Sequence, residues 1–212
     1  MMSMSRTAMP ATPRLFAFLL VFLSVTINPD SVAGVLHEAA KTGDLERVQK
    51  LVVQGVDVNE DNANGETPLI LASLEGQGEV TSYLLQRGAR VDARSSSGMS
   101  PLHAAAYGGH ADIAALLIAK GADVNESDNR FQVTPLHLAA EENRVAVAEL
   151  LLKNGADVKA VERNGYTALT RAGWREHWEI VSMLLANGAA CQESEKVGEW
   201  LHKECSTRAD SN

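Results

Sequence analysis

The chain has 212 residues, 45% of them hydrophobic, and its 27 acidic and 19 basic residues give a formal net charge of −8. The sequence contains no basic stripe of the kind that a nucleic-acid backbone requires, and an acidic chain is not attracted to an anionic membrane surface. This composition argues against nucleic acid and anionic membranes as partners, and it is compatible with a protein partner that carries a basic patch.

The first 33 residues differ in composition from the rest of the chain. Residues 1–14 contain two arginines and no acid, residues 15–27 read LFAFLLVFLSVTI, and residues 31–33 read SVA. A basic start, a short apolar core and a small-residue end are typical of a secretory signal peptide. The core is shorter than the roughly 20 residues of a membrane span, and it lacks the amphipathic, Arg-rich character of a mitochondrial presequence. We therefore expect residues 1–33 to be removed on export to the periplasm, which would leave a mature chain without a membrane span.

From residue 34 onward the chain repeats itself in steps of 33 or 34 residues. Three columns keep this period through five units: Gly55, Gly88, Gly121, Gly155 and Gly188; Leu36, Leu69, Leu102, Leu136 and Leu169; Ala39, Ala72, Ala105, Ala139 and Ala172. A fixed period of this size predicts a solenoid of stacked units. The predicted repeat domain covers residues 34–197, with units at about 34–64, 65–97, 98–130, 131–164 and 165–197.

Each unit is expected to contain two short helices. The pairs Thr67-Pro68, Ser100-Pro101 and Thr134-Pro135 are typical helix starts, since the hydroxyl caps a backbone N–H and proline suits the first helical position. A second helix with paired apolar residues follows, and the recurring glycine predicts its end, where the backbone turns left-handed.

These residues carry a family resemblance. The segment from Gly98 to Asn125, GMSPLHAAAYGGHADIAALLIAKGADVN, resembles the ankyrin repeat. The resemblance implies an all-α solenoid of paired antiparallel helices with β-turn fingers, which binds other proteins and catalyses no reaction. The chain departs from the pattern at Gly34-Val35, where the first unit lacks the Thr-Pro start. It also departs at Phe131-Gln132, where the fourth unit has one extra residue, and at Ala168, which replaces proline.

The histidines are interpreted as parts of the scaffold. His37, His103 and His137 share one repeat column, and His110 and His177 share another. A histidine that recurs at the repeat period is expected to bridge units by hydrogen bonds. The sequence contains no G-x-S-x-G, P-loop or H-E-x-x-H motif, so we predict neither catalytic residues nor a cofactor.

Two cysteines lie late in the chain. Cys191 and Cys205 could form a disulfide that closes a loop of about 15 residues, as the oxidising compartment of an exported protein permits, or Cys191 could be a small buried apolar residue. With His202 they make only three ligands at irregular spacing, so no metal site is predicted. Residues 198–212 are expected to form a short cap or tail that is disordered from Ser206 onward.

A binding surface is predicted at the finger tips, within residues 63–66, 96–99, 129–133 and 163–166, and at the ends of the first helices. Six large apolar side chains occupy these positions, where a solvated surface would be polar: Met99, Tyr107, Phe131, Val133, Tyr166 and Trp174. We expect them to converge on one concave face, flanked by Glu141, Glu142, Arg163 and Arg175, and to bind a protein. The alternative is that each packs under a neighbouring finger, and Trp174 could share a pocket with Trp178. Glu141 and Glu142 are the reason to expect a basic patch on the partner.

The sequence therefore favours an exported, monomeric, non-catalytic binding scaffold. A specific form of this hypothesis is an inhibitor or immunity protein of a periplasmic enzyme. The alternative is a stress accessory factor that assists a redox enzyme such as a catalase. An enzyme with an unrecognised site is the third and weakest interpretation.

Overall fold

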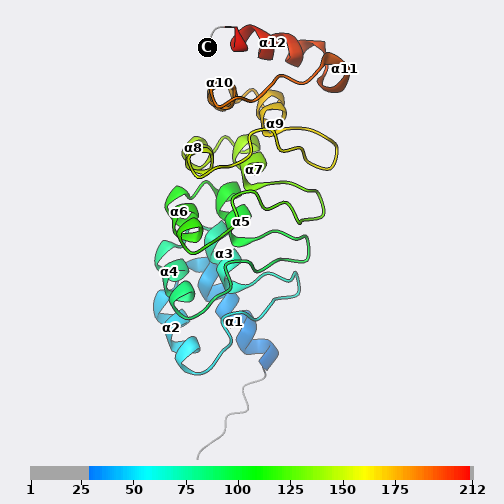
Figure 1. The fold of residues 1–212 in the computed structure, drawn as a ribbon. Coiled ribbons are helices and arrows are strands. Elements are labelled where there is room, and N and C mark those ends of the chain that lie inside the picture. Colours follow the sequence, from blue (N-terminus) through cyan, green and yellow to red (C-terminus); the bar gives the residue numbers. More distant parts are fainter. Residues whose placement is uncertain (1–28, 211–212) are drawn as a thin grey trace, which may run out of the picture.

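The computed structural model describes residues 29–210, with side chains from residue 34, and over this range the fold is all-α, as predicted. Ten of the twelve helices in this range form five pairs stacked in chain order (Figure 1). The first helices of the pairs are α1 (Pro29–Thr42), α3 (Pro68–Leu74), α5 (Pro101–Gly108), α7 (Pro135–Glu141) and α9 (Ala168–Trp174). The second helices are α2 (Leu45–Val53), α4 (Gly78–Gln86), α6 (Ala111–Ala119), α8 (Val145–Lys153) and α10 (Trp178–Ala186). The loops between pairs extend to one side as a row of fingers.

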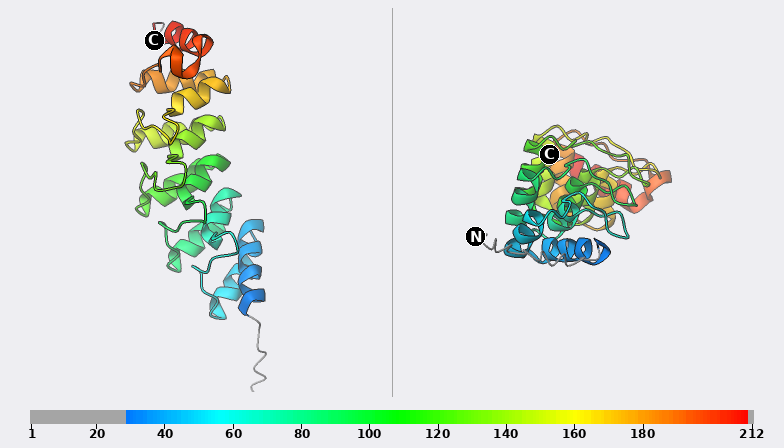
Figure 2. Two further views of the ribbon diagram at one scale, coloured as in Figure 1. Left: turned by 90° about the vertical axis from the view of Figure 1, so that its right-hand side faces the viewer. Right: turned by 90° about the horizontal axis from the view of Figure 1, so that it is seen from below.

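The array is elongated, with α1 at one end and the short helices α11 (Ser194–Val197) and α12 (Glu199–Ala209) at the other (Figure 2). Helix α1 begins at Pro29, ahead of residue 34, where we expected the first repeat helix to start. The expected cleavage site therefore falls within α1. Residues 1–28, which hold most of the predicted signal peptide, lie outside the described residues.

The predicted helix starts are confirmed. Thr67, Ser100 and Thr134 stand immediately before the proline that begins α3, α5 and α7, and each side-chain oxygen accepts a hydrogen bond from the N–H three residues further on. Thr167 caps α9 in the same way although Ala168 replaces the proline. The hydroxyl is therefore the feature that all four starts share.

The recurring glycines end the second helices, as predicted. Gly88 and Gly121 have φ angles of 87° and 94°, and the other three glycines of the column are also left-handed. A residue with a Cβ adopts this conformation only at a cost in energy, which explains why the column keeps glycine.

The leucine and alanine columns form the core, as predicted. The five leucines of the column, from Leu36 to Leu169, are at most 1% exposed, and so are the five alanines, from Ala39 to Ala172. Alanine has almost no side chain, so successive first helices pack closely; the residues of α3 contact those of both α1 and α5. One apolar core therefore runs the length of the array.

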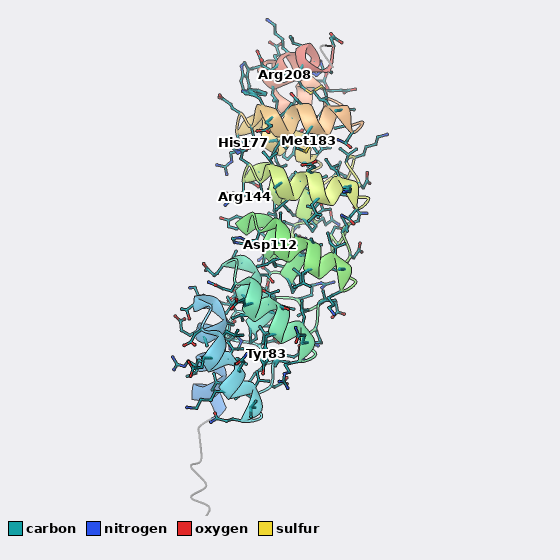
Figure 3. The ribbon with its side chains drawn as sticks, turned by 90° about the vertical axis from the view of Figure 1, so that its left-hand side faces the viewer. Tyr83, Asp112, Arg144, His177, Met183 and Arg208 are labelled. Atoms are coloured by element: carbon teal, nitrogen blue, oxygen red, sulfur yellow. A yellow bond between two sulfur atoms is a disulfide. The ribbon has the colours of Figure 1, made fainter. Side chains whose placement is uncertain are left out.

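A second set of contacts joins each unit to the one before it. From α4 to α10, a side chain at the start of each second helix donates a hydrogen bond to a carbonyl at the end of the first helix of the previous unit: Gln77 to Lys41, His110 to Leu74, Arg144 to Tyr107 and His177 to Glu141. Figure 3 shows Arg144 and His177 at the same edge of successive units. The prediction that the His110 and His177 column bridges units is confirmed, and glutamine and arginine make the same contact.

The last pair is covered by α12. Leu201 is 2% exposed and packs against Gly173, where an added Cβ would lie 2.4 Å from a Leu201 methyl carbon. A disulfide joins Cys205 of α12 to Cys191, which precedes α11. The cap is thus fixed by an apolar contact and by a covalent bond.

The predicted disorder from Ser206 onward is wrong for the described residues, because α12 continues to Ala209. The Arg208 guanidinium lies 4.2 Å from the centre of the Trp178 ring, and the rings of Trp178 and Trp200 are 6.0 Å apart in an edge-to-face arrangement. Contacts with α10 therefore hold the end of a helix whose own composition is polar.

Replacing a leucine of the core column should destabilise the array. Leu102→Ala or Leu136→Ala leaves a cavity between packed first helices and should lower the free energy of unfolding by roughly 2–5 kcal/mol, measured by denaturant titration. Val53, which is 76% exposed, supplies the control, since Val53→Ala should change it by less than about 0.5 kcal/mol. Equal stability of the leucine variants and the control would show that the column is not the core.

Candidate protein-binding surface

One residue at the start of each finger holds the finger tip through side-chain hydrogen bonds. These residues are Asn62, Ser95, Asn129 and Glu162. The side-chain oxygen of Asn62 accepts hydrogen bonds from the N–H groups two and four residues on, and that of Asn129 does the same. Ser95 and Glu162 each accept from the N–H four residues on. Asn129, which falls within a predicted tip, is only 5% exposed, so it supports the finger from inside and is not available to a partner.

Successive tips also bond to one another through their backbones. The N–H of Ser96 donates to the carbonyl of Asn64 at 2.8 Å, and that of Arg163 donates to the carbonyl of Phe131 at 2.9 Å. The third joint, from Arg130 to Ser97, is longer at 3.3 Å. The tips therefore form one connected edge along the array.

Buried histidines tie the fingers to the helices, which confirms their predicted structural role. His103 is fully buried, its Nδ1 accepts from the Ser100 hydroxyl at 2.8 Å and its Nε2 donates to the Val133 carbonyl at 2.7 Å. His137 makes the equivalent bonds to Thr134 and to the Tyr166 carbonyl. Both contact patterns require the neutral ring with its proton on Nε2.

Burial lowers the pKa of His103 and of His137 from 6.5 to about 4, and the hydrogen bonds to the carbonyls of Val133 and Tyr166 only partly oppose this shift. The pKa shift has a structural origin and gives no sign of a catalytic base, because each ring nitrogen already has a partner within the scaffold.

The structure divides the six predicted apolar residues into three groups. Tyr107, Phe131 and Trp174 are 44–51% exposed, which is unusual for large apolar side chains. Met99 and Tyr166 are half-buried. The prediction for Val133 is wrong: it is 5% exposed. Its N–H bonds to Asn129 and its carbonyl to His103, and these two bonds hold the residue inside the base of the finger.

The ring of Trp174 contacts that of Tyr166. The two rings are 4.5 Å apart in an edge-to-face arrangement, which stabilises a pair beyond the area that it buries. Trp178, which was considered as an alternative partner for Trp174, packs against Trp200 of the cap. The indole N–H of Trp174 also reaches the carbonyl of Val197 at 3.5 Å, so the ring is oriented but only half covered.

Glu141 is already paired within the chain. Its carboxylate accepts from Arg171 and, at 3.1 Å, from Arg175. Partial burial works against the ionised form, but the bonds from Arg175 and Arg171 outweigh it and lower the pKa of Glu141. Glu141 therefore gives no ground for expecting a basic partner, while Glu142, half-buried at the end of α7, forms no ion pair within residues 29–210.

A shallow hollow of about 240 Å³ lies between the Tyr166–Trp174 pair and the carboxylate of Glu141. It is lined by Glu141, Glu162, Asn164, Tyr166, Arg171, Trp174 and Arg175. This volume is below the roughly 300–1,000 Å³ of small-molecule sites and is closer to the size of one side chain. Arg171 and Glu162, whose side chains lie 3.7 Å apart, were not among the site residues predicted from the sequence. The spacing of Arg171 and Arg175 by one helical turn is the signal that could have identified Arg171.

Within residues 29–210, no group of histidine, cysteine and carboxylate side chains could hold a metal ion. In the same range, no helix is both long and apolar enough to span a membrane.

The stacked helix pairs and the row of fingers are the features of a helical-repeat protein. The family model "Ankyrin repeats (3 copies)" matches residues 36–128 and 122–195, which is more than half of the chain. The chain belongs to the ankyrin repeat family.

Two curated relatives are similar over short segments. Ankyrin repeat domain-containing protein 40 of Mus musculus is 55% identical over 51 residues, which are 24% of this chain and 14% of the relative. Protein phosphatase 1 regulatory subunit 27 of Mus musculus is 40% identical over 60 residues, which are 28% of this chain and 38% of the relative. The matched segments thus span well under half of either relative.

The buried histidines should make the protein acid-sensitive. Between pH 6.5 and about 4, His103 and His137 bind a proton in the unfolded chain but not in the folded one. Above pH 6.5 both histidines are neutral in the folded and the unfolded chain, so they have no pH-dependent effect on stability. As the pH drops toward 4, proton binding favours the unfolded chain, and the free energy of unfolding should fall by on the order of 3 kcal/mol per histidine. Urea titrations at several pH values between 7.5 and 4 measure this loss.

Two variants test the assignment. The doubly substituted His103→Thr, His137→Thr protein uses the residue found at Thr170 in the same column and should lose less stability on acidification. His110→Gln copies the residue at Gln77 and should keep the wild-type pH profile. An unchanged profile in the threonine variant would contradict the assignment.

Proposed function

We propose that this chain is an exported scaffold of five ankyrin repeats that binds one partner protein on its concave face and catalyses no reaction. The observation that carries the proposal is the exposure of Tyr107, Phe131 and Trp174 on positions that the scaffold does not use. Half-exposed aromatic side chains on a rigid surface are typical hot-spot residues of protein interfaces. The hydrogen-bonded fingers support this reading, since a preformed surface loses little conformational entropy on binding.

The role that we favour is inhibition or neutralisation of an exported enzyme. Protein phosphatase 1 regulatory subunit 27 is, by its name, a subunit that regulates an enzyme, and a 60-residue segment of it is similar to this chain. A continuous rigid surface suits the blocking of an active site. Capture of partners from the native exported fraction, followed by mass spectrometry, tests this role: a hydrolase or toxin would support it, and a catalase or peroxidase would favour the accessory-factor alternative.

Export is supported by two independent features. Residues 1–33 have the composition of a secretory signal peptide, and Cys191 and Cys205 form a disulfide. Disulfides persist in oxidising compartments such as the periplasm and are rare in the cytosol.

The mature protein should begin near Gly34. Amino-terminal sequencing of the native protein, together with fractionation of the cells, measures this directly. An intact Met1 in the soluble cytoplasmic fraction would rule out export by a cleaved signal peptide.

Truncating a central aromatic residue should weaken partner binding. Tyr107→Ala and Phe131→Ala should each cost roughly 2 kcal/mol or more of binding free energy without unfolding the protein, because both side chains project from the scaffold. Calorimetry gives the affinity, and a thermal melt of each variant gives its stability. Trp200→Ala is the matched control, since Trp200 is 53% exposed but lies on the cap.

The outcomes separate the two interpretations of these residues. If both variants bind like the wild type, the aromatic residues are not the interface. If they lose binding only in proportion to lost stability, the rings serve to pack the fingers.

A further inference from the structure

The recognition surface of the last three units consists of residues 130–131, 141–142, 162–166 and 174–175. Its exposed charged side chains all have the same sign: they are Arg130, Arg163 and Arg175. The carboxylates among these residues are less accessible, since Glu162 is 3% exposed and Glu141 and Glu142 are half-buried. A partner would therefore meet guanidinium groups first.

The pairing of the charges increases this asymmetry. Arg171 and Arg175 neutralise Glu141, and Arg171 also lies 3.7 Å from Glu162. Arg130 and Arg163 form no ion pair with any of the described residues. Two arginines at neighbouring finger tips are thus left to pair with groups outside the chain.

These arginines lie beside the exposed aromatic residues. The Arg130 guanidinium is 6.0 Å from the centre of the Phe131 ring, and the N–H of Arg163 is bonded to the Phe131 carbonyl. Arg175 lines the hollow next to Tyr166 and Trp174. Basic and apolar groups therefore alternate along one edge.

Much of the negative charge of the chain lies outside this surface, although the exposed Asp128 and Glu176 border it. Acidic residues occupy the first turns of four second helices, at Glu46, Glu79, Asp112 and Glu179. Figure 3 views the array from the side of these helices and shows Asp112 there. The net charge of −8 thus conceals a local surface of opposite character.

We propose that the recognition surface binds an acidic, apolar-anchored segment of a partner protein, with carboxylates paired to Arg130 and Arg163. This inference rests on the proposed function and adds the chemistry of the partner. Arginine binds carboxylates through two parallel hydrogen bonds, which gives direction as well as strength. One apolar side chain of the segment fills the hollow beside Trp174. Glu141 does not support the expectation of a basic partner, because it is already neutralised within the chain.

The test is a selection of random twelve-residue peptides displayed on phage against the full-length protein. The enriched peptides are synthesised, and their affinities are measured by fluorescence anisotropy. We expect an excess of aspartate and glutamate together with an aromatic or aliphatic residue. The doubly substituted Arg130→Glu, Arg163→Glu protein should bind these peptides at least tenfold more weakly, and raising the salt from 50 to 500 mM should weaken only the wild type substantially.

The control makes the same change of charge away from the surface. Arg90 is exposed in the turn after α4, so Arg90→Glu should leave the affinity unchanged. A thermal melt confirms that each variant is folded.

The other outcomes would overturn either the inferred chemistry of the partner or the binding surface itself. If the enriched peptides are basic or uncharged but lose affinity with Phe131→Ala, the surface binds proteins and the inferred partner chemistry is wrong. If the peptides are insensitive to both Phe131→Ala and the arginine changes, or if no peptide is enriched, the proposed binding surface fails as well.

Discussion

Helices of seven to nine residues are too short to persist alone in water, and every helix from α2 to α10 has this length. Each unit therefore depends on its neighbours for its structure. The buried leucine and alanine columns supply the apolar part of this dependence, and the polar part includes one side-chain donor at the start of each second helix from α4 to α10. Because glutamine, histidine and arginine all serve as the donor, the geometry of the joint is maintained while the residue varies.

The repeated features could be predicted from the sequence because each is determined within one unit. The Thr-Pro start before α3, the left-handed Gly88 and the buried Leu102 follow from local rules that recur at the period. Features that depend on one particular neighbour could not be predicted in this way. Val133 is buried by bonds to Asn129 and His103 in the finger that has the extra residue, and the carboxylate of Glu141 meets two arginines from the next unit.

Some properties of the recognition surface follow from the repeat, and others depend on particular neighbouring residues. Its positions were predictable, since they are what remains when the scaffold columns are removed. Its electrostatic character was not predictable from composition, because it depends on which carboxylates are covered by which guanidinium groups. Tyr166 illustrates the difference: its place at a finger tip follows from the period, whereas its contact with Trp174 depends on the spatial approach of a tip and a helix end.

The contact between Gly173 and Leu201 bears on how such an array can evolve. In the other units the corresponding position holds Ala40, Ser73, Ala106 or Ala140, and a side chain there would collide with Leu201. The last unit is thus adapted to its cap, and the disulfide makes the two covalently inseparable. Gene duplication can lengthen the array in its interior, where a new copy finds neighbours like those of its parent. A copy of an interior unit inserted between α10 and the cap would place alanine or serine against Leu201 where Gly173 now lies, so this end of the array accepts a duplicated unit less readily than its middle does.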